Sequence, residues 1–559
     1  MSDSATQQID HSLIQPFLSF YYFIQNQLIM KMLYSFWALT LCLCISSAAL
    51  GQRVVDIPAS GDPANPTDIF PAIMGDTTAT GERTDNNTVY RLANGATYVT
   101  SGRLVNNADW TLHIEAVDLA DTENKAILTR QPNSGGSYPD IGRPEGSFTF
   151  KNLWIISGEK GPGENHDWGR LRASGANSRV IVQDCIVEKD RGGFIQVRAD
   201  GLKIYIDNCI FRNGGDRRVL QGNGRGVDAR NFYLDTLMMT NTVVHNIQDR
   251  LFRSQGATQP HNYLMIDHCT SFNTAGRHGF IQLGQVREAI ITNNLFINPI
   301  MLGTTPAFTD EQNQPDDATH KVITLDTLYT DTDLTIASNN IFWTQEVTDY
   351  WASNDSVSQP GVLSMLVKQQ LGADTADAFF SEVVELEGRP QSILQYVSDL
   401  YDDPASTDMF DFIVEDSLVA GTGFDSGNLF DFDDFSTCYA ASSQSATAGT
   451  DGGPIGAVVG CENFTTGIFA ANAGALGLQV MPNPVHGTAR FAFEQAAPGE
   501  VSLAIYDLQG RRLAVVQRGF LPAGGQQLSW EVPTSLTAGL YLARLHSQGK
   551  VQTLKFLLN

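Results

Sequence analysis

Short apolar runs that end in a small polar residue recur throughout the middle of the chain. A typical copy is Ile206–Phe211, where β-branched and aromatic side chains surround an Asp-Asn corner. The polar marks fall at Asn152, Asp184, Asn208, Asn241, His268, Asn293 and Asn339. They recur at intervals of about 24–33 residues, with one longer interval of about 46, and intervals of this size indicate stacked repeats. Each copy therefore predicts a strand followed by a turn.

Stacking of these repeats predicts a parallel β-helix. A coil with two or three short strands cannot bury its apolar face alone, so each strand pairs with its copies in the adjacent coils. The polar marks then form a ladder of turns, because Asn and Asp tolerate left-handed backbone geometry and stacked amides can bond one another. The next column is expected to face inward; it holds Leu153, Cys185, Cys209, Thr242, Cys269, Asn294 and Asn340.

The start of the chain carries the pattern of an export signal. Residues 30–51 combine a basic start, an apolar run over 33–45 and a small-x-small cleavage site, which predicts a signal peptide. The apolar run is too short to span a bilayer comfortably, and no other stretch could cross one, so we expect no membrane span in the mature protein. Residues 1–29 are interpreted as a mis-assigned or disordered N-terminal extension.

The remaining pattern divides the chain into a β-helix and a C-terminal domain. Residues 52–88 are expected to be an extended lead-in and residues 89–460 the β-helix. An insertion at about 345–415 has helical apolar spacing over 379–386 and 392–401. Residues 461–477 resemble a linker in composition, and the alternating strands of 478–559 predict a small antiparallel β-sandwich.

The net charge bears on the possible partners, and the cysteine positions bear on the core and on disulfide formation. The formal net charge of −25 argues against nucleic acid as a partner. Cys185, Cys209 and Cys269 share one position of the repeat, which predicts an inward stack of small side chains. Cys438 and Cys461 are a candidate disulfide in an oxidising compartment, and the sequence leaves this pairing open.

Two resemblances follow from these motifs. The repeats, with the phrases Asn293–Phe296 and Asn339–Phe342, resemble the right-handed parallel β-helix group that contains pectate lyases and related polysaccharide lyases. This resemblance implies an all-β solenoid, here with a small helical insertion and a C-terminal antiparallel β-sandwich. Pro482–Pro484, Ile505–Arg511 and Ala538–Tyr541 resemble the type IX secretion sorting domain of Bacteroidota. That implies export through the outer membrane, with the protein released or attached at the cell surface.

A recurring Asp-Arg dipeptide provides the candidate functional face. It occurs at residues 190–191, 216–217 and 249–250, and Gly276-Arg277 takes its place in the next coil. Counted from the corner ladder, Arg191, Arg217, Arg250 and Arg277 are expected to form one file with a spacing of about 4.7–4.9 Å. Near the file in sequence are Gln196, Gln221, Arg253, Gln282, Arg218 and His278.

This basic file has two interpretations. Each Asp could pair with an Arg in a structural charge ladder, since uncompensated like charges in register repel. Alternatively, the file could line a groove for an anionic polymer, with arginine forks on uronate carboxylates or sulfates. The groove would bind substrate through Arg191, Arg218, Arg253, Gln196, Gln221 and Gln282.

The lyase resemblance implies β-elimination at a uronic acid. Arginines or Ca²⁺ would neutralise the C6 carboxylate, and a base would take the C5 proton. The catalytic candidates are Arg250, as base or carboxylate clamp, together with Arg217, Arg277 and the alternative base His278. Asp216, Asp249 and Asp190, with Glu188 beside them, are the calcium candidates. Neither a pectate-lyase calcium cluster nor the paired carboxylates of a pectin-type hydrolase is evident from the spacing.

Three functions are therefore compatible with the sequence. The first is a secreted lyase acting on an acidic polysaccharide, the second a non-catalytic glycan-binding or adhesin-like surface protein, and the third a glycoside hydrolase. The expected partners are an acidic polysaccharide and, through residues 478–559, the type IX secretion machinery. We expect a monomer.

Overall fold

The computed structural model describes most of the chain beyond residue 51. Up to residue 457 it describes residues 52–62, 65–133, 136, 138–157, 171–215, 223–276, 278–304, 320–389, 392–402, 436–450 and 452–457. Further on it describes residues 478–481, 485, 487–495, 499–506, 512–533, 536–537, 539–547 and 550–558. The expected N-terminal extension and signal peptide, at 1–51, and the expected linker at 461–477 lie outside the described residues. None of the helices in the described ranges is long and apolar enough to cross a membrane.

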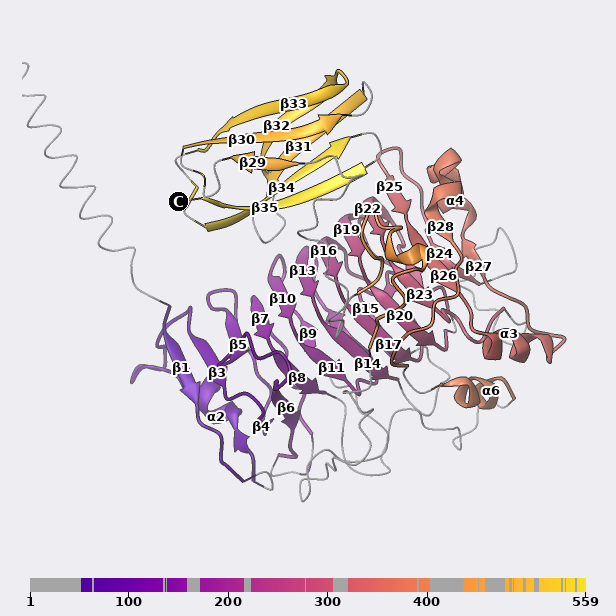
Figure 1. Cartoon of the computed structure of the whole chain (residues 1–559). Helices are drawn as coiled ribbons and strands as arrows, with labels where there is room; N and C mark the ends of the chain where they lie inside the picture. Colours follow the sequence, from indigo (N-terminus) through magenta and orange to yellow (C-terminus); the bar gives the residue numbers. More distant parts are fainter. Residues whose placement is uncertain are drawn as a thin grey trace, which may run out of the picture. The chain divides into compact units, whose positions relative to one another are not determined.

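Three parallel sheets form a β-helix, in which each regular coil contributes one strand to each sheet (Figure 1). Sheet A contains β1 (Val54–Ile57), β3 (Val89–Leu92), β5 (Leu112–Ala116), β7 (Phe148–Lys151), β10 (Arg179–Gln183), β13 (Leu202–Asp207), β16 (Leu234–Thr240), β19 (His261–Asp267), β22 (Val286–Thr292) and β25 (Asp333–Ala337). Sheet B contains β2 (Thr67–Asp68), β4 (Thr97–Thr100), β6 (Ala126–Arg130), β8 (Leu153–Ile156), β11 (Ile186–Glu188), β14 (Ile210–Gly214), β17 (Val243–Ile247), β20 (Thr270–Thr274), β23 (Leu295–Ile297), β26 (Asn339–Phe342) and β28 (Phe379–Phe380). Sheet C contains β9 (Leu171–Ala173), β12 (Gly193–Val197), β15 (Arg225–Asp228), β18 (Phe252–Arg253), β21 (Ile281–Gln282), β24 (Lys321–Thr324) and β27 (Gly361–Leu363).

The turn between sheets A and B uses the predicted ladder of polar residues. Asn152, Asp184, Asn208, Asn241, His268 and Asn293 all have left-handed backbone geometry, with φ between 46° and 59°. The amide of Asn208 donates to Asp184 Oδ1 at 2.6 Å, and that of Asn241 donates to Asn208 Oδ1 at 3.0 Å. In the last coil the prediction is wrong by one position, because Ser338 takes the left-handed turn and Asn339 begins β26.

A second ladder of polar residues forms the turn that follows sheet B. Its members are Lys189, Asn213, Asn246, Asn273 and Asn298, with φ between 50° and 58°. Asn298 Nδ2 donates to Asn273 Oδ1 at 3.0 Å, and Asn273 Nδ2 donates to Asn246 Oδ1 at 3.2 Å. Each member lies five residues after a corner residue of the first ladder, so the sequence repeats at these positions too, and this second ladder was not predicted.

The interior is mainly apolar and contains a short polar column. Cys185, Cys209 and Cys269 are buried free thiols, as predicted from their shared repeat position. Further along this column stand Asn294 and Asn339, both fully buried, so the inward residue of the last coil is Asn339 and not Asn340. Asn294 Nδ2 donates to Asn339 Oδ1 at 2.8 Å and to Ile266 O at 3.0 Å, which satisfies these amide groups inside the core.

The N-terminal end of the β-helix begins earlier than expected. Residues 52–88 were predicted to be an extended lead-in, but β1 and β2 already pair with sheets A and B. The short helix α2 (Ile69–Met74) follows β2 and buries Ile69 and Ile73 in the same core. These two side chains extend the apolar core into the first described coil.

The described part of the expected insertion combines helices with two strands, β27 and β28, that continue sheets C and B. Its helices are α3 (Gln345–Ala352), α4 (Met365–Leu371), the 3₁₀ turn η3 (Gly372–Asp374), α5 (Thr375–Ala378) and α6 (Leu394–Asp402). The helix predicted near 392–401 is confirmed as α6. The helix predicted over 379–386 is wrong, because Phe379–Phe380 forms β28 beside β26 and residues 381–386 form neither helix nor strand. Cys438 is disulfide-bonded, and its expected partner Cys461 lies outside the described residues.

The C-terminal domain is the predicted antiparallel β-sandwich. A three-stranded sheet contains β29 (Gln479–Met481), β30 (Thr488–Gln495) and β33 (Gly524–Glu531). A four-stranded sheet contains β32 (Arg512–Leu521), β31 (Gly499–Tyr506), β34 (Gly539–Ser547) and β35 (Lys550–Leu558). Phe491, Trp530 and Tyr541 pack around Phe556 in a core of the domain's own.

Candidate functional site

Sheet C is basic in a protein that is otherwise acidic. Its strands contain four basic residues, Arg172, Arg225, Arg253 and Lys321, and one acidic residue, Asp228. The whole chain has 36 Lys and Arg against 61 Asp and Glu. The positive charge is therefore local to this sheet, which suits an anionic ligand better than a cationic one.

Sheet register places one polar side chain of each coil in a single column. The paired positions, from β9 to β24, are Arg172, Gln196, Asp228, Arg253, Gln282 and Thr324. Gln196, Arg253 and Gln282 were selected from the sequence, and the structure brings them together in this column. Asp228 was not selected.

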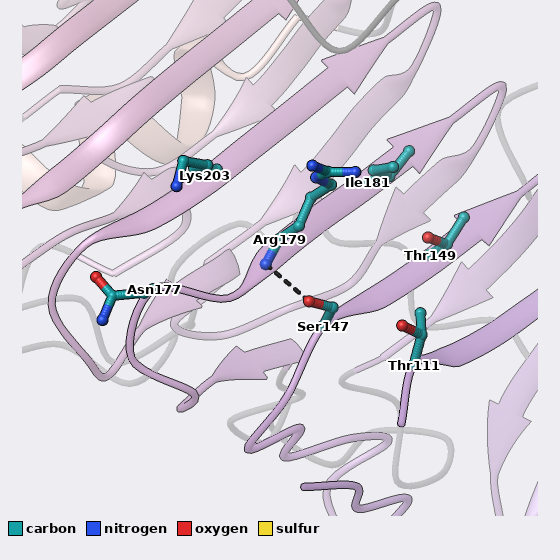
Figure 2. Close-up of a pocket in the computed structure, with 7 residues that line it drawn as sticks. All are labelled: Thr111, Ser147, Thr149, Asn177, Arg179, Ile181 and Lys203. Atoms are coloured by element: carbon teal, nitrogen blue, oxygen red, sulfur yellow. Dashed lines mark hydrogen bonds between the residues drawn. The ribbon is translucent and has the colours of Figure 1, made fainter. Parts of the chain in front are cut away.

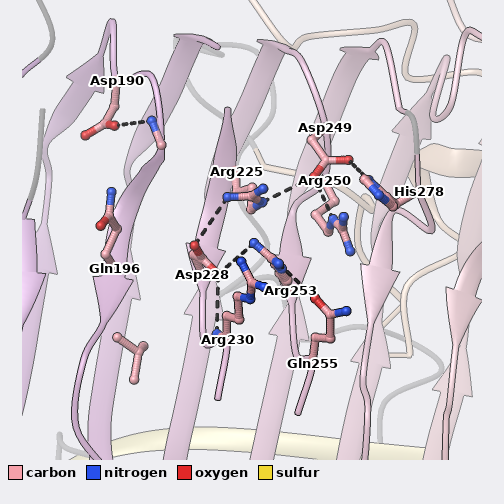
Figure 3. Close-up of polar contacts among 12 residues, drawn as sticks. Asp190, Gln196, Arg225, Asp228, Arg230, Asp249, Arg250, Arg253, Gln255 and His278 are labelled. Atoms are coloured by element: carbon pink, nitrogen blue, oxygen red, sulfur yellow. Dashed lines mark hydrogen bonds and ion pairs between the residues drawn. The ribbon is translucent and has the colours of Figure 1, made fainter. Parts of the chain in front are cut away.

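Asp249 is the hub of the charged cluster beside this column (Figure 3). Its Oδ1 bonds to Nδ1 of His278 at 2.7 Å. Its Oδ2 accepts from Nε of Arg250 at 2.7 Å and from Nε of Arg225 at 3.2 Å. One carboxylate therefore joins an imidazole and two guanidinium groups.

Asp228 is the second anion of the cluster. Its Oδ2 accepts from Nη1 of Arg225 at 3.3 Å, and its Oδ1 lies 3.7 Å from Nη1 of Arg253. Arg225 thus bridges the two aspartates, while Nη2 of Arg253 donates to Gln255 Oε1 at 2.8 Å. Arg250 extends in another direction and donates from Nη1 to Gln282 Oε1 at 2.6 Å.

The charges in this cluster shift one another's protonation equilibria. Burial alone would raise the pKa of Asp249, but the charges of Arg250, His278 and Arg225 hold it well below its usual range. Burial lowers the pKa of Arg250, and the charge of Asp249 opposes that shift. Burial and the neighbouring charge of Arg225 lower the pKa of Arg253 to about 9. Asp249 therefore stays ionised at neutral pH.

Solvent reaches the cluster at its edge. The side chains of Asp249 and Arg250 are 0% and 1% exposed, whereas those of His278 and Arg253 are 9% and 7% exposed. A ligand would therefore first meet His278 and Arg253. The buried Asp249 and Arg250 would act on it through their charge and through the groups that they hold.

Several residues selected from the sequence cannot be placed. Asp216, Arg217, Arg218, Gln221 and Arg277 lie outside the described residues.

Arg191 is described, and it does not continue the expected file. Its carbonyl accepts from the amide of Gly224, and the register of sheet C pairs Gly193 with Arg225. Counted back from the pair Val227 and Phe252, the residue beside Arg250 is Arg225. Arg191 is therefore two residues out of register with these arginines.

The two described calcium candidates, Asp190 and Asp249, are engaged by other side chains and backbone amides. Among the residues that the structure describes, no group of three or more His, Cys, Asp or Glu is placed to hold a metal ion. Both oxygens of Asp249 already contact cationic or imidazole nitrogens. Asp190 accepts from the amide of Gly192 at 2.7 Å and from the hydroxyl of Ser157 at 3.2 Å. Glu188 pairs instead with Arg212 at 2.5 Å.

A shallow depression on another sheet is distinct from this cluster. Figure 2 shows it on sheet A, where Arg179 and Lys203 lie among hydroxyl and amide side chains. Its volume is about 250 Å³, and Lys203 already lies 3.4 Å from Asp235. None of the residues selected from the sequence lines it, so we place the candidate site at Asp249.

Comparison with known proteins identifies only the C-terminal domain. Residues 479–559 match the family model described as a secretion system C-terminal sorting domain. A search of curated proteins found no match to the chain. The match confirms the predicted type IX sorting domain, and the protein is exported by that route to the cell surface or the extracellular space.

Proposed function

We propose that this protein is a polysaccharide lyase that cleaves an acidic, uronate-containing polysaccharide by β-elimination. The observation that carries the proposal is the cluster at Asp249, which places a carboxylate-bound imidazole beside three arginines on the basic sheet of an exported β-helix. This arrangement combines a candidate base with charges that would neutralise a substrate carboxylate.

His278 is the best placed base among the described residues. Asp249 bonds to Nδ1, which fixes the orientation of the ring, so proton transfer in the proposed reaction would use Nε2. A neutral imidazole accepts a proton near neutral pH more readily than a guanidinium group can. We therefore move the base from Arg250, the first choice from the sequence, to His278.

The arginines would stabilise the negative charge that develops during elimination. Arg253 is at the solvent edge, where its guanidinium group can meet a C6 carboxylate. Arg225, which is 5% exposed, and Arg250, which is 1% exposed, keep the local field positive, although Asp249 and Asp228 offset part of their charge. A carboxylate neutralised in this way makes the adjacent C5 proton more acidic.

The bond changes of the proposed reaction balance without a redox partner. His278 takes the C5 proton, and the C–H electron pair forms the C4=C5 double bond. The C4–O bond to the leaving sugar breaks, and its oxygen is protonated by the imidazolium group or by water. The products are an unsaturated uronate end and a new hydroxyl end.

Non-catalytic glycan binding is the second candidate function. The pairing of Arg225, Arg250 and Arg253 with Asp228 and Asp249 favours it, because such a charge ladder can be purely structural. A basic sheet of this kind would still attract an acidic glycan.

Turnover with a matched pair of variants tests the proposal. The chain from residue 52 to 559 is incubated with pectate, alginate, ulvan or glycosaminoglycans, with Ca²⁺ or with EDTA, while the ultraviolet absorbance of unsaturated products is recorded. We expect His278→Gln to lower kcat on the accepted polymer by about 10²–10⁴-fold. His113→Gln is the control, since His113 pairs with Glu115 at 2.9 Å on sheet A, away from sheet C.

The other outcomes are distinguishable. New reducing ends without ultraviolet absorbance would indicate a hydrolase, and binding without either product would indicate a glycan-binding protein. Full activity of His278→Gln would remove His278 from the reaction.

A further inference from the structure

Helix α6 of the insertion packs against the turns that carry the candidate site. A separate apolar cluster joins Ile393, Tyr396 and Val397 to Ala275 and Met301, and α3 adds Val347 and Trp351. Ala275 lies three residues before His278 and is fully buried. The insertion therefore packs against the residues that precede His278 in the chain.

Gln248 is the polar link between α6 and Asp249. It directly precedes Asp249, is 3% exposed, and donates from Nε2 to the hydroxyl of Tyr396 at 2.7 Å. Both groups are buried, so this hydrogen bond is shielded from water. The side chain of Gln248, which directly precedes Asp249, is thus held by α6, about 150 positions later in the chain.

The backbone of Gln248 joins three consecutive coils. Its amide donates to Gly214 O at 2.9 Å, and its carbonyl accepts from the amide of Gly276 at 3.0 Å. Gly276 has φ of 71°, and a Cβ there would lie 2.6 Å from Ile300 Cα, so this turn has little room to move. A displacement of Gln248 would therefore shift Asp249 and the turn that leads to His278 together.

A second set of contacts fixes the other side of the same turn. The amides of Met301 and Leu302 donate to Thr274 and Ala275 at 2.8 and 2.9 Å. The indole of Trp351 in α3 donates to Met301 O at 2.9 Å. Helix α3 thus holds Thr274 through Met301, and helix α6 holds Gly276 through Gln248.

We propose that Tyr396 is a positioning residue, which acts through Gln248 to hold Asp249 and His278 in their paired geometry. The inference rests on the proposed function for its catalytic consequence. It assigns the insertion a role in orienting the acid–base pair without contact between α6 and the substrate. Among the described residues, His278 bonds to Asp249, and Asp249 also bonds to Arg225 and Arg250.

Removal of one hydroxyl group tests this inference. Tyr396→Phe keeps the ring packed in the apolar cluster and removes the hydroxyl that accepts from Gln248. The control is Tyr98→Phe, because Tyr98 is also fully buried and its hydroxyl donates to Ile57 O at 2.9 Å in the N-terminal coils. The chain from residue 52 to 559 is used, and the imidazole NMR signals of His278 are recorded at one pH in each variant.

We expect Tyr396→Phe to shift the imidazole NMR signals of His278 relative to the unmodified protein, because a displaced Asp249 changes the 2.7 Å hydrogen bond at Nδ1. On an accepted polymer, kcat should fall about three- to tenfold with little change in KM. Tyr98→Phe should leave both quantities unchanged. Gln248→Leu, which removes the other partner, should reproduce the effect of Tyr396→Phe on the imidazole signals.

The NMR signals of His278 separate this inference from the proposed function. If no polymer is cleaved but the imidazole signals of His278 shift only in Tyr396→Phe and Gln248→Leu, the proposed reaction fails and the positioning role stands. Unchanged signals in both variants would overturn the positioning role, whatever the activity. An equal shift in Tyr98→Phe would show that the change reflects general loosening of the fold, and would overturn it as well.

Discussion

His261 shows how strongly burial controls a single side chain of this β-helix. It begins β19 and is fully buried. Its Nδ1 accepts from the amide of Leu234 at 2.8 Å, and Nε2 bonds to the hydroxyl of Ser254 at 2.7 Å. Because Nδ1 is an acceptor, the proton of the neutral ring lies on Nε2. Burial lowers the pKa of His261 to about 3, so the ring remains neutral in the folded protein.

The low pKa of His261 predicts that the folded protein loses stability in acid. The unfolded chain takes up a proton near pH 6.5, while the folded ring does so only near pH 3, so stability is lost as pH falls between these values. The loss amounts to about 1.4 kcal/mol for each pH unit within that window. Measurement of the free energy of unfolding against pH should show a shallower slope for His261→Gln, with His245, also buried and with a lowered pKa, supplying the remainder.

The partly buried pair His113–Glu115 supplies the comparison for that measurement. Burial opposes the lowered pKa of Glu115 and the contact with His113 favours it, so His113→Gln should weaken that carboxyl's contribution and leave the slope due to His261 in place. If His261→Gln leaves the slope unchanged, the acid sensitivity originates elsewhere.

At the residue scale, the sequence predicted part of the candidate site. Counting from the corner ladder selected Arg250, Arg253, Gln282 and His278, because few residues separate the corner from sheet C in their coils. The same count did not select Arg225 and Asp228, since many more residues separate Asn208 from β15. The sequence feature that could have identified Arg225 and Asp228 is their separation of three residues, which Arg250 and Arg253 share.

At the scale of the element, two turns of left-handed geometry set the pitch of the coils. Both ladders place Asn where the backbone has positive φ and where an amide can bond to the adjacent coil. The two properties can be separated experimentally, because glycine keeps the geometry and loses the side chain, whereas alanine loses both.

Asn241 is the best position for that experiment, with φ of 46° and a 3.0 Å bond to Asn208. We expect Asn241→Gly to cost about 1 kcal/mol of stability through the lost hydrogen bond. Asn241→Ala should cost about 1–2 kcal/mol more, because left-handed geometry is unfavourable for alanine. Urea unfolding measures both values, and equal destabilisation would contradict the role assigned to the backbone geometry.

The error over 379–386 has a physical origin at the same scale. A short apolar run does not distinguish a buried strand from a helix by periodicity alone. Phe379–Phe380 becomes a strand because β26 offers an unpaired edge beside it, and this edge exists only in the folded solenoid. The regular coils were predictable because each repeats the pattern of its neighbour.

At the scale of the whole molecule, the β-helix and the C-terminal domain each have their own sheets and core. Within the described residues, the strands of 478–558 pair only with one another, and their buried side chains form a separate cluster. The chemistry proposed for sheet C draws on none of these residues.

Removal of residues 478–559 should therefore separate export from folding. We expect the chain truncated after residue 477 to keep the circular dichroism and melting transition of the β-helix, and any lyase activity, but to fail in export. The measurement compares periplasmic and extracellular fractions of the two chains. Loss of the melting transition on truncation would show that the β-helix depends on the domain for its stability.

The stacked thiols have a consequence for the lifetime of the exported protein. The thiolate is the reactive form of cysteine, and burial raises the pKa of Cys185 to about 12. Cys209 and Cys269 are sealed in the same column, so outside the cell all three remain reduced while the coils stay closed. These thiols can be oxidised only when the coils open, so the extent of their oxidation reports how often the solenoid of an exported molecule has opened.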